Sequence, residues 1–210
     1  MDTSREVWAI LVAAGQGTRF GRPKHDVELH GEPLWVHAER ALRAGGIREV
    51  VIVGDVPGGI EGGPRRRDSV ARGLDRVPVD VELVLIHDAA RPLASAELVR
   101  RVLERLSVGD VAGVVPAVPV ADTLKEIEGD AVLRTVDRSS LVAVQTPQGF
   151  IASVLRRAHA AGDDDASDDA MLVEAIGERV AMVIGDPTNL KITYPADLEL
   201  AATFRSIGNG

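Results

Sequence analysis

Short, unbroken apolar runs recur along the chain, and each is followed by a loop and a more polar segment. The runs cover residues 7–13, 50–54, 81–87, 111–118 and 180–184. Runs that are continuously apolar, rather than alternating, are typical of strands buried on both faces of a parallel sheet. Most of the segments between them have helical periodicity. The pattern therefore predicts an α/β fold, in which helices cover both faces of a doubly wound, mostly parallel sheet.

Proline, glycine and capping side chains mark the ends of the predicted helices. Pro33 begins one helical pattern and Gly45 follows its end, which is the usual placement of these two residues. Ser95 is placed to cap another helix. The predicted helices cover 33–44, a short segment that starts after the loop 57–67 with Asp68 or Ser69 as its cap and ends at Leu74, 95–106, 151–161, 168–176 and 195–205.

Residues 119–148 interrupt the alternation of strands and helices. Two β-like pieces, 123–127 and 132–136, flank a turn at Glu128-Gly129-Asp130, and no helical period is present. This arrangement predicts a hairpin arm that projects from the sheet. The expected organisation is one domain, 1–210, with an arm subdomain at about 119–148.

Composition narrows the classes of function. The chain has 210 residues, a net charge of −8, 3% aromatic residues and no cysteine. A negative net charge disfavours non-specific binding to nucleic acid or anionic lipid, and few aromatics disfavour a single-strand stacking surface. No apolar run reaches the roughly 20 residues of a membrane span. We expect a cytoplasmic protein without nucleic-acid or membrane partners.

Lysine is rare in a chain that is rich in arginine. Of the 24 cationic residues, 21 are Arg and three are Lys, at positions 24, 125 and 191. A compact ammonium suits one phosphate oxygen in a tight place, whereas a planar guanidinium needs more room. All three lysines are therefore candidates for contact with a phosphate oxygen.

The loop after the first predicted strand, residues 14–21, is rich in glycine and is followed by cationic residues. Gly15 and Gly17 allow backbone N–H groups to approach phosphates, and Arg19 and Lys24 add positive charge. The sequence is neither a P-loop nor a dinucleotide fingerprint, which would need glycine in place of Phe20. Because ligands bind at the carboxyl ends of parallel strands, this loop is a candidate triphosphate site.

The loop after the third long strand carries the sequence His87-Asp88-Ala89-Ala90-Arg91-Pro92. Asp88, at the strand end, is well placed to hold Mg²⁺ opposite the glycine-rich loop, and Arg91 is a candidate contact for an anionic substrate. Strand alternation points His87 away from Asp88, so that His87 is interpreted as structural.

These loops and several later motifs, taken together and in order, closely resemble the 2-C-methyl-D-erythritol 4-phosphate cytidylyltransferase family. The resemblance covers almost the whole chain. The matching motifs are Ala13-Ala14-Gly15-x-Gly17-x-Arg19 with Pro23-Lys24, Gly62-Gly63-x-x-Arg66-x-x-Ser69-Val70, His87-Asp88-Ala89-Ala90-Arg91-Pro92, Asp122-Thr123-x-Lys125, Thr135-Val136-x-Arg138, Gln145-Thr146-Pro147-Gln148 and Asn189-x-Lys191-x-Thr193.

The resemblance implies a Rossmann-like nucleotidyltransferase fold, with CTP and a small polyol phosphate as substrates and Mg²⁺ or another divalent cation at Asp88. It implies CMP transfer to methylerythritol phosphate in non-mevalonate isoprenoid synthesis. By similarity, the catalytic residues are Arg19, Lys24, Arg138 and Lys191. The nucleotide-binding residues are Ala13, Ala14, Gly15, Gly17, Arg19, Lys24, Gly63, Ser69, Asp88 and Ala89. The substrate-binding residues are Asp88, Arg91, Thr123, Arg138, Thr146, Ser167 and Lys191.

The same resemblance implies a homodimer, because Thr123 and Arg138 would reach a neighbour's substrate from the arm. Two alternatives remain open: a ribitol-5-phosphate cytidylyltransferase, and a non-catalytic nucleotide-binding regulator. This sequence also departs from the family. The stretch 54–63 is short, and Pro64 replaces a polar residue that often follows the two glycines. Both departures affect the nucleobase side of the expected pocket.

Overall fold

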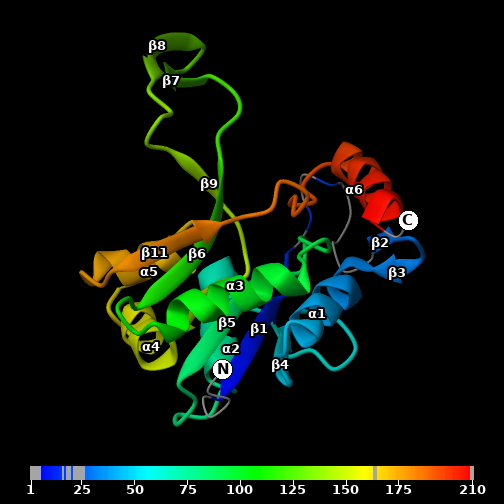
Figure 1. The fold of residues 1–210 in the computed structure, drawn as a ribbon, viewed down its shortest axis with the longest axis vertical. Coiled ribbons are helices and arrows are strands. Elements are labelled where there is room, and N and C mark those ends of the chain that lie inside the picture. The colour runs from blue at the N-terminus through cyan, green and yellow to red at the C-terminus, as the bar shows by residue number, and fades with distance from the viewer. Residues whose placement is uncertain (1–5, 16, 18–19, 21–26, 163–164, 209–210) are drawn as a thin grey trace.

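A computed structural model describes residues 6–15, 17, 20, 27–162 and 165–208 (Figure 1). The strands are β1 (Val7–Val12), β2 (Glu28–Leu29), β3 (Glu32–Pro33), β4 (Glu49–Val53), β5 (Leu83–Asp88), β6 (Gly113–Pro119), β7 (Leu124–Glu128), β8 (Ala131–Val136), β9 (Val142–Val144), β10 (Gln148–Ile151) and β11 (Val180–Ile184). The helices are α1 (Leu34–Ala44), α2 (Arg66–Leu74), α3 (Ala96–Ser107), α4 (Ala152–Ala160), α5 (Asp169–Ala175) and α6 (Pro195–Gly208).

The central sheet has the order β11-β6-β10-β5-β1-β4, with β9 paired to β6. β1 pairs in parallel with both β4 and β5, and β11 pairs in parallel with β6. Successive side chains of β1 enter opposite cores: Ile10 packs on one face of the sheet, whereas Ala9 and Leu11 pack on the other. This double burial explains why the strands are continuously apolar, and it confirms the predicted α/β class.

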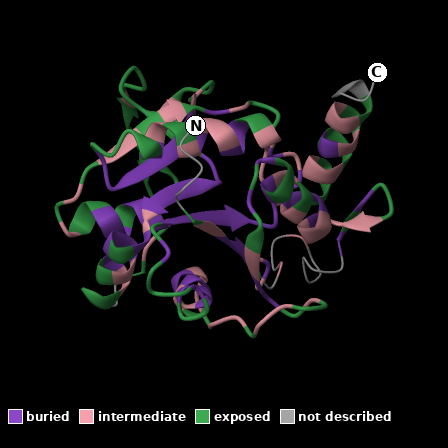
Figure 2. Cartoon of the chain, turned by 60° about the horizontal axis from the view of Figure 1, so that its bottom comes forward, coloured by how far each residue is buried: buried purple, intermediate pink, exposed green. Residues whose placement is uncertain are grey.

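Helices cover both faces of the sheet (Figure 2). Leu42 of α1 and Val102 of α3 contribute to one core, whereas Val70 of α2, Leu155 of α4 and Leu172 of α5 contribute to the other. A third, smaller cluster packs α6 against β2 and the start of α1, through Ala201, Leu29 and Leu34. Within the described part of the chain, no helix is long and apolar enough to cross a membrane.

β10 is an element that the sequence pattern did not predict. It lies between β5 and β6 and is antiparallel to both, with Gly149 opposite Leu85 and Val114. Gly149 fits because a side chain there would collide with Val102 of α3, at 2.8 Å from a built Cβ. The four-residue strand runs directly into α4, and so no loop signal separates the two elements in the sequence.

The start of α2 was also predicted incorrectly. The helix begins at Arg66, inside the segment predicted as a loop, and neither Asp68 nor Ser69 is its cap. Asp68 lies in the first turn, where its Oδ2 accepts a hydrogen bond from the Arg65 backbone N–H at 3.1 Å. Asp68 is the third residue of the helix, and its side chain reaches back to the amide of the residue before the helix. This bond is the part of a capping box that the third helical residue makes.

The arm is formed by β7 and β8, a hairpin that projects from the body of the molecule (Figure 1). Its strands confirm the two predicted β pieces, with a bulge between Glu126 and Ile127. The chain returns through β9, which was not predicted, to the end of β6. Ile127 and Val132 are 63% and 61% exposed, so apolar side chains of the arm lack cover from their own chain.

Candidate active site

Four loops meet at the carboxyl ends of the parallel strands. The Ala13 backbone N–H donates to the Val53 carbonyl at 2.7 Å, and the Ala89 N–H donates to the Val12 carbonyl at 3.0 Å. The segment after β11 joins them, because the Ile192 N–H donates to the Ala90 carbonyl at 2.8 Å. The two ends of the sequence motif set are thereby brought to one edge of the sheet, where ligands bind in folds of this class.

A cavity of about 390 Å³ opens where these loops meet. Its lining includes every described residue that the sequence analysis assigned to the nucleotide, together with Lys191. The residues that line it are Val12, Ala13, Ala14, Gly15, Gly17, Leu34, Trp35, Gly63, Pro64, Arg65, Arg66, Ser69, Asp88, Ala89, Ala90 and Lys191.

Two glycines allow the loops of the cavity to touch. A Cβ built on Gly62 would lie 2.3 Å from the Ala14 Cβ, so no larger residue fits there without moving a loop. Beside it, the Gly63 N–H donates to the Ser69 Oγ at 3.0 Å. Ser69, which is 1% exposed, therefore shapes the Gly63 loop. These contacts fix the part of the cavity wall formed by Ala14, Gly63 and Ser69.

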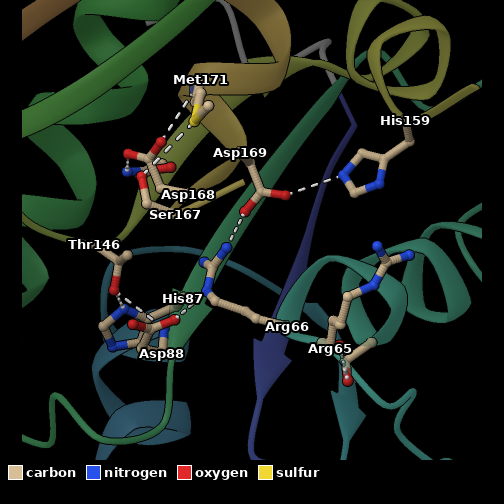
Figure 3. Close-up of polar contacts among 12 residues, drawn as sticks. Arg65, Arg66, His87, Asp88, Thr146, His159, Ser167, Asp168, Asp169 and Met171 are labelled. Atoms are coloured by element: carbon tan, nitrogen blue, oxygen red, sulfur yellow. Dashed lines mark hydrogen bonds and ion pairs between the residues drawn. The ribbon is translucent and has the colours of Figure 1, made fainter. Parts of the chain in front are cut away.

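Asp88, which lines the cavity, forms ion pairs with two cations, and Figure 3 shows the one with Arg66. Its Oδ1 accepts from Arg66 Nε at 3.0 Å, and its Oδ2 accepts from Lys191 Nζ at 2.7 Å. Burial alone would raise the pKa of Asp88, but Arg66 and Lys191 hold that pKa well below its usual range. Asp88 is consequently a carboxylate at any physiological pH.

Thr146 lies behind Asp88 and not in the wall of the cavity. It is 4% exposed, and its Oγ1 accepts from the Asp88 backbone N–H at 3.0 Å. The same oxygen contacts His87 Nδ1 at 2.8 Å. Thr146 therefore holds the 87–88 backbone in place, and its assignment to the substrate stays a prediction. Burial lowers the pKa of His87 to about 4, so this ring is neutral at pH 7.

Arg66 is a site residue that the sequence-based assignment missed. Besides Asp88, it binds Asp169 at the start of α5, with Nη1 donating to Oδ2 at 2.7 Å. The other oxygen of Asp169 contacts His159 Nε2 of α4 at 3.0 Å (Figure 3). The signal was present, since Arg66 lies in the quoted Gly62–Val70 motif. Its partner Asp169 is 103 positions away, and no local pattern connects them.

The remaining predicted substrate residues lie apart from this cavity. Arg91 donates to the Asn189 carbonyl at 2.7 Å and so braces the loop that carries Lys191. Ser167 is exposed just before α5. Thr123 and Arg138 are exposed on the arm, where Arg138 donates to the Val120 and Ala121 carbonyls. Arg19 and Lys24 lie outside the described residues.

Asp88 is also the one carboxylate among the described residues of the cavity. Over the described ranges, no group of three His, Cys, Asp or Glu side chains is close enough to hold a metal by itself. Mg²⁺ commonly takes one or two protein carboxylates together with substrate phosphates and water. The residues present therefore fit a divalent cation that enters with a triphosphate, and do not form a self-sufficient metal site.

Comparison with known proteins agrees with this geometry. Residues 7–205 match the sequence profile of the 2-C-methyl-D-erythritol 4-phosphate cytidylyltransferase family. The chain is 47% identical to the enzyme of that name from Rhodococcus jostii (strain RHA1), over 95% of each chain. It is also 47% identical to the one from Rhodococcus opacus (strain B4), over 93% of each. The crystal structure of 2-C-methyl-D-erythritol 4-phosphate cytidylyltransferase from Thermus thermophilus superposes with a TM-score of 0.80 at 40% identity, over 94% of this chain and 98% of that one.

Proposed function

The chain belongs to the 2-C-methyl-D-erythritol 4-phosphate cytidylyltransferase family, and we propose that the cavity around Asp88 is where it carries out that family's reaction. The enzyme transfers CMP from CTP to 2-C-methyl-D-erythritol 4-phosphate and forms CDP-methylerythritol and pyrophosphate, a step of non-mevalonate isoprenoid synthesis. The observation that supports this placement most strongly is the meeting of Asp88 and Lys191 with Gly15 and Gly17 in one cavity.

The reaction needs positioned cations more than a general base. A phosphate monoester has a second pKa of about 6, so the attacking phosphate oxygen is mostly ionised at neutral pH. A bond forms between that oxygen and the α-phosphorus of CTP. The bond from this phosphorus to the bridging oxygen breaks, and its electron pair leaves with pyrophosphate. The substrate phosphate and the triphosphate of CTP, both anions, must be brought together. Negative charge then increases on the phosphates during the reaction, and cations such as Lys191 stabilise it.

The neutral state of His87 agrees with such a mechanism. Its ring is fully buried and is bonded to Thr146, and its pKa of about 4 leaves no proton to give at pH 7. In the proposed reaction no proton has to be removed from the nucleophile or given to the leaving group. His87 then serves with Thr146 to fix the backbone at Asp88.

Asp88 would hold the divalent cation, Mg²⁺ or another, that the proposed reaction uses. When bound, the ion supplies neutralisation of the negative charge on the triphosphate. Arg66 and Lys191, the two cations paired with Asp88, are protein groups that could reach phosphate oxygens beside it. Of the two, Lys191 has Asp88 as its one ion-pair partner within the described residues and is 39% exposed, so it is the cation that would reach a phosphate.

The arm is proposed to complete the site of a second copy of the chain. Arg138 and Thr123 are exposed and do not line the cavity of their own chain. The projecting hairpin also exposes Ile127 and Val132, as a surface that is covered by a partner would. In a homodimer, Arg138 would meet the polyol phosphate from across the interface. A cytoplasmic location belongs to the same proposal, because the cell's CTP lies there.

Neither alternative function is favoured. The family profile and the relatives at 47% identity carry the methylerythritol phosphate name, not that of a ribitol-5-phosphate enzyme. A regulator without activity would be expected to lose charged site residues, whereas Asp88 and Lys191 are both present and paired.

Pyrophosphate release tests the substrate assignment. The protein is incubated with CTP and Mg²⁺, and methylerythritol 4-phosphate and ribitol 5-phosphate are offered in separate reactions. Release that depends on methylerythritol phosphate is the expected result. Release with ribitol phosphate alone would move the enzyme to the alternative substrate, and CTP binding without release from either would support the regulator.

A further inference from the structure

Arg66 occupies the same cavity as Asp88 and Lys191 but is held differently. It is the first residue of α2, and its side chain is 22% exposed against 39% for Lys191. Two carboxylates from different elements grip it, Asp88 of β5 through Nε and Asp169 of α5 through Nη1 (Figure 3). Arg66 therefore keeps a charge partner and a fixed direction even when Asp88 turns to a ligand.

Asp169 holds Arg66 in place, and each of its oxygens already has a partner. It is fully buried, and its two oxygens are taken up by Arg66 and by His159. A buried carboxylate is costly unless it is paired and hydrogen-bonded. Burial would raise the pKa of Asp169, but His159 and Arg66 hold it below the ordinary value, so the residue stays charged. His159 in turn comes from α4 and is fixed by that helix.

The arginine itself is not fully satisfied by the protein. Nη2 of Arg66 is buried and has no hydrogen-bond partner among the described residues. An unpaired buried donor costs free energy, which a ligand that accepts from it would recover. Arg66 also lines the cavity and is partly exposed, so an anion bound there could accept from its guanidinium.

We propose that Arg66 is a further catalytic residue of this enzyme, donating to the phosphate oxygens of the nucleotide that gain charge as pyrophosphate leaves, and that Asp169, held by His159, positions it. The inference rests on the proposed function of the cavity. In this proposal, the Lys191 side chain moves to reach a phosphate, whereas the Arg66 side chain stays in place. A stationary donor acts mainly on the transition state, since no reorganisation is needed when charge develops.

The contact role is tested by replacing Arg66 and supplying its charge from solution. Arg66→Gln should lower kcat for pyrophosphate release about 100- to 1000-fold, with a much smaller change in the KM for CTP. Arg66→Lys, which keeps the charge but loses the fork, should recover part of the activity. Millimolar guanidinium should stimulate Arg66→Gly but not the wild type. If Arg66→Gly does not fold, the Gln and Lys variants decide the matter through kcat.

The positioning role is tested in the rescue assay. If Asp169 orients the guanidinium, added guanidinium should rescue Arg66→Gly but fail to rescue Arg66→Gly combined with Asp169→Asn. Asp169→Asn alone should lose about 100-fold in kcat, the scale of a misplaced group. His159→Leu should lower kcat by less, because His159 contacts Asp169 and not Arg66. Arg157→Gln, also on α4 and paired only with Glu178 at the surface among the described residues, should behave as wild type.

The outcomes separate this inference from the proposed function. A wild-type protein that releases no pyrophosphate would remove the proposed function. An active wild type with Arg66→Gln within about threefold of its kcat would overturn the role of Arg66 and leave the proposed function intact. Guanidinium rescue of Arg66→Gly that persists with Asp169→Asn would overturn the positioning role of Asp169.

Discussion

Lys191 Nζ donates to Asp88 Oδ2 across 2.7 Å, although the two residues are 103 positions apart in the chain. The pair joins the end of β5 to the segment after β11, which the Ile192–Ala90 backbone hydrogen bond holds in place. The pair keeps the Lys191 ammonium beside Asp88, the carboxylate proposed to bind the metal. The activity of the enzyme should depend on this pair more than its stability does.

Lys191→Gln should lower kcat for pyrophosphate release about 100- to 1000-fold, because a cation that offsets charge on the phosphates is lost. Its free energy of unfolding should fall by about 1–3 kcal/mol, since Asp88 is buried but keeps Arg66 as a charge partner. Steady-state kinetics and urea denaturation measure the two quantities. A variant that loses stability but keeps kcat would contradict the role given to Lys191.

Thr146→Val should impair Asp88 without touching the cavity wall. The variant removes the hydroxyl that accepts from the Asp88 N–H and contacts His87, and leaves a buried amide unpaired. We expect a loss of about 1–3 kcal/mol in unfolding free energy and a kcat lowered about 10- to 100-fold through displacement of Asp88. Thr146→Ser keeps the oxygen and should retain most of both. Equal effects of Val and Ser would show that the hydroxyl is unimportant.

Gly62→Ala should separate the two loops that touch at the cavity. Its methyl group would lie 2.3 Å from the Ala14 Cβ, so a loop must move, at a cost of about 1–3 kcal/mol. The KM for CTP should rise. Gly109→Ala is the matched control: it is strained by its φ of +81° but meets no atom within 4 Å, and it lies beyond α3. Gly109→Ala should lose stability with an unchanged KM, and a similar rise in KM for both variants would refute the loop contact.

Acidification should destabilise the protein through His87. Its pKa is about 4 in the folded chain against 6.5 for the free side chain, so between these values only the unfolded chain binds this proton. Because of this residue, the free energy of unfolding should decrease by about 1.4 kcal/mol for each pH unit by which the pH is lowered. His87→Asn should have a shallower slope from pH 6.5 to 4. His37, whose pKa burial also lowers, is present in both proteins and cancels. Parallel pH profiles of the two proteins would contradict a neutral buried His87.

Mixing two inactive variants tests whether the arm works across a dimer. In a mixed dimer of Arg138→Ala and Lys191→Gln, one of the two sites receives an intact arm and an intact cavity. After subunit exchange, random pairing should restore about a quarter of the wild-type activity. Each variant exchanged with itself is the control. Mixed samples that stay as inactive as the controls would show that Arg138 does not act on a neighbouring site.

The strands and loops that form the cavity could be predicted from local sequence. Continuous apolar runs identify β1, β4 and β5, and the rule that ligands bind at strand ends directs attention to Gly15, Asp88 and their neighbours. Asp88 and Lys191, which line the same cavity, were both predicted as site residues because each lies within a distinctive short motif. Their direct contact, however, depends on the order of strands in the sheet, which no short pattern specifies.

What could not be predicted depends on distant partners or on short elements. Arg66 meets Asp88 and Asp169 at separations of 22 and 103 residues. β10 has four residues and no flanking turn before α4, so its antiparallel insertion leaves no periodic signal. Thr146 was assigned to the substrate because its motif matches the family, whereas only the packing of β10 beside β5 reveals that its hydroxyl faces the backbone of Asp88.

The most direct test of the central claim is phosphorus NMR of the complete reaction. Wild-type protein, CTP, Mg²⁺ and methylerythritol 4-phosphate are combined, and the phosphorus signals are followed with time. CMP transfer predicts that the CTP and monoester signals decline together while a new diphosphate ester and pyrophosphate appear in equal amounts. Unchanged CTP, or pyrophosphate that appears with CMP and without a diphosphate ester, would contradict transfer to methylerythritol phosphate.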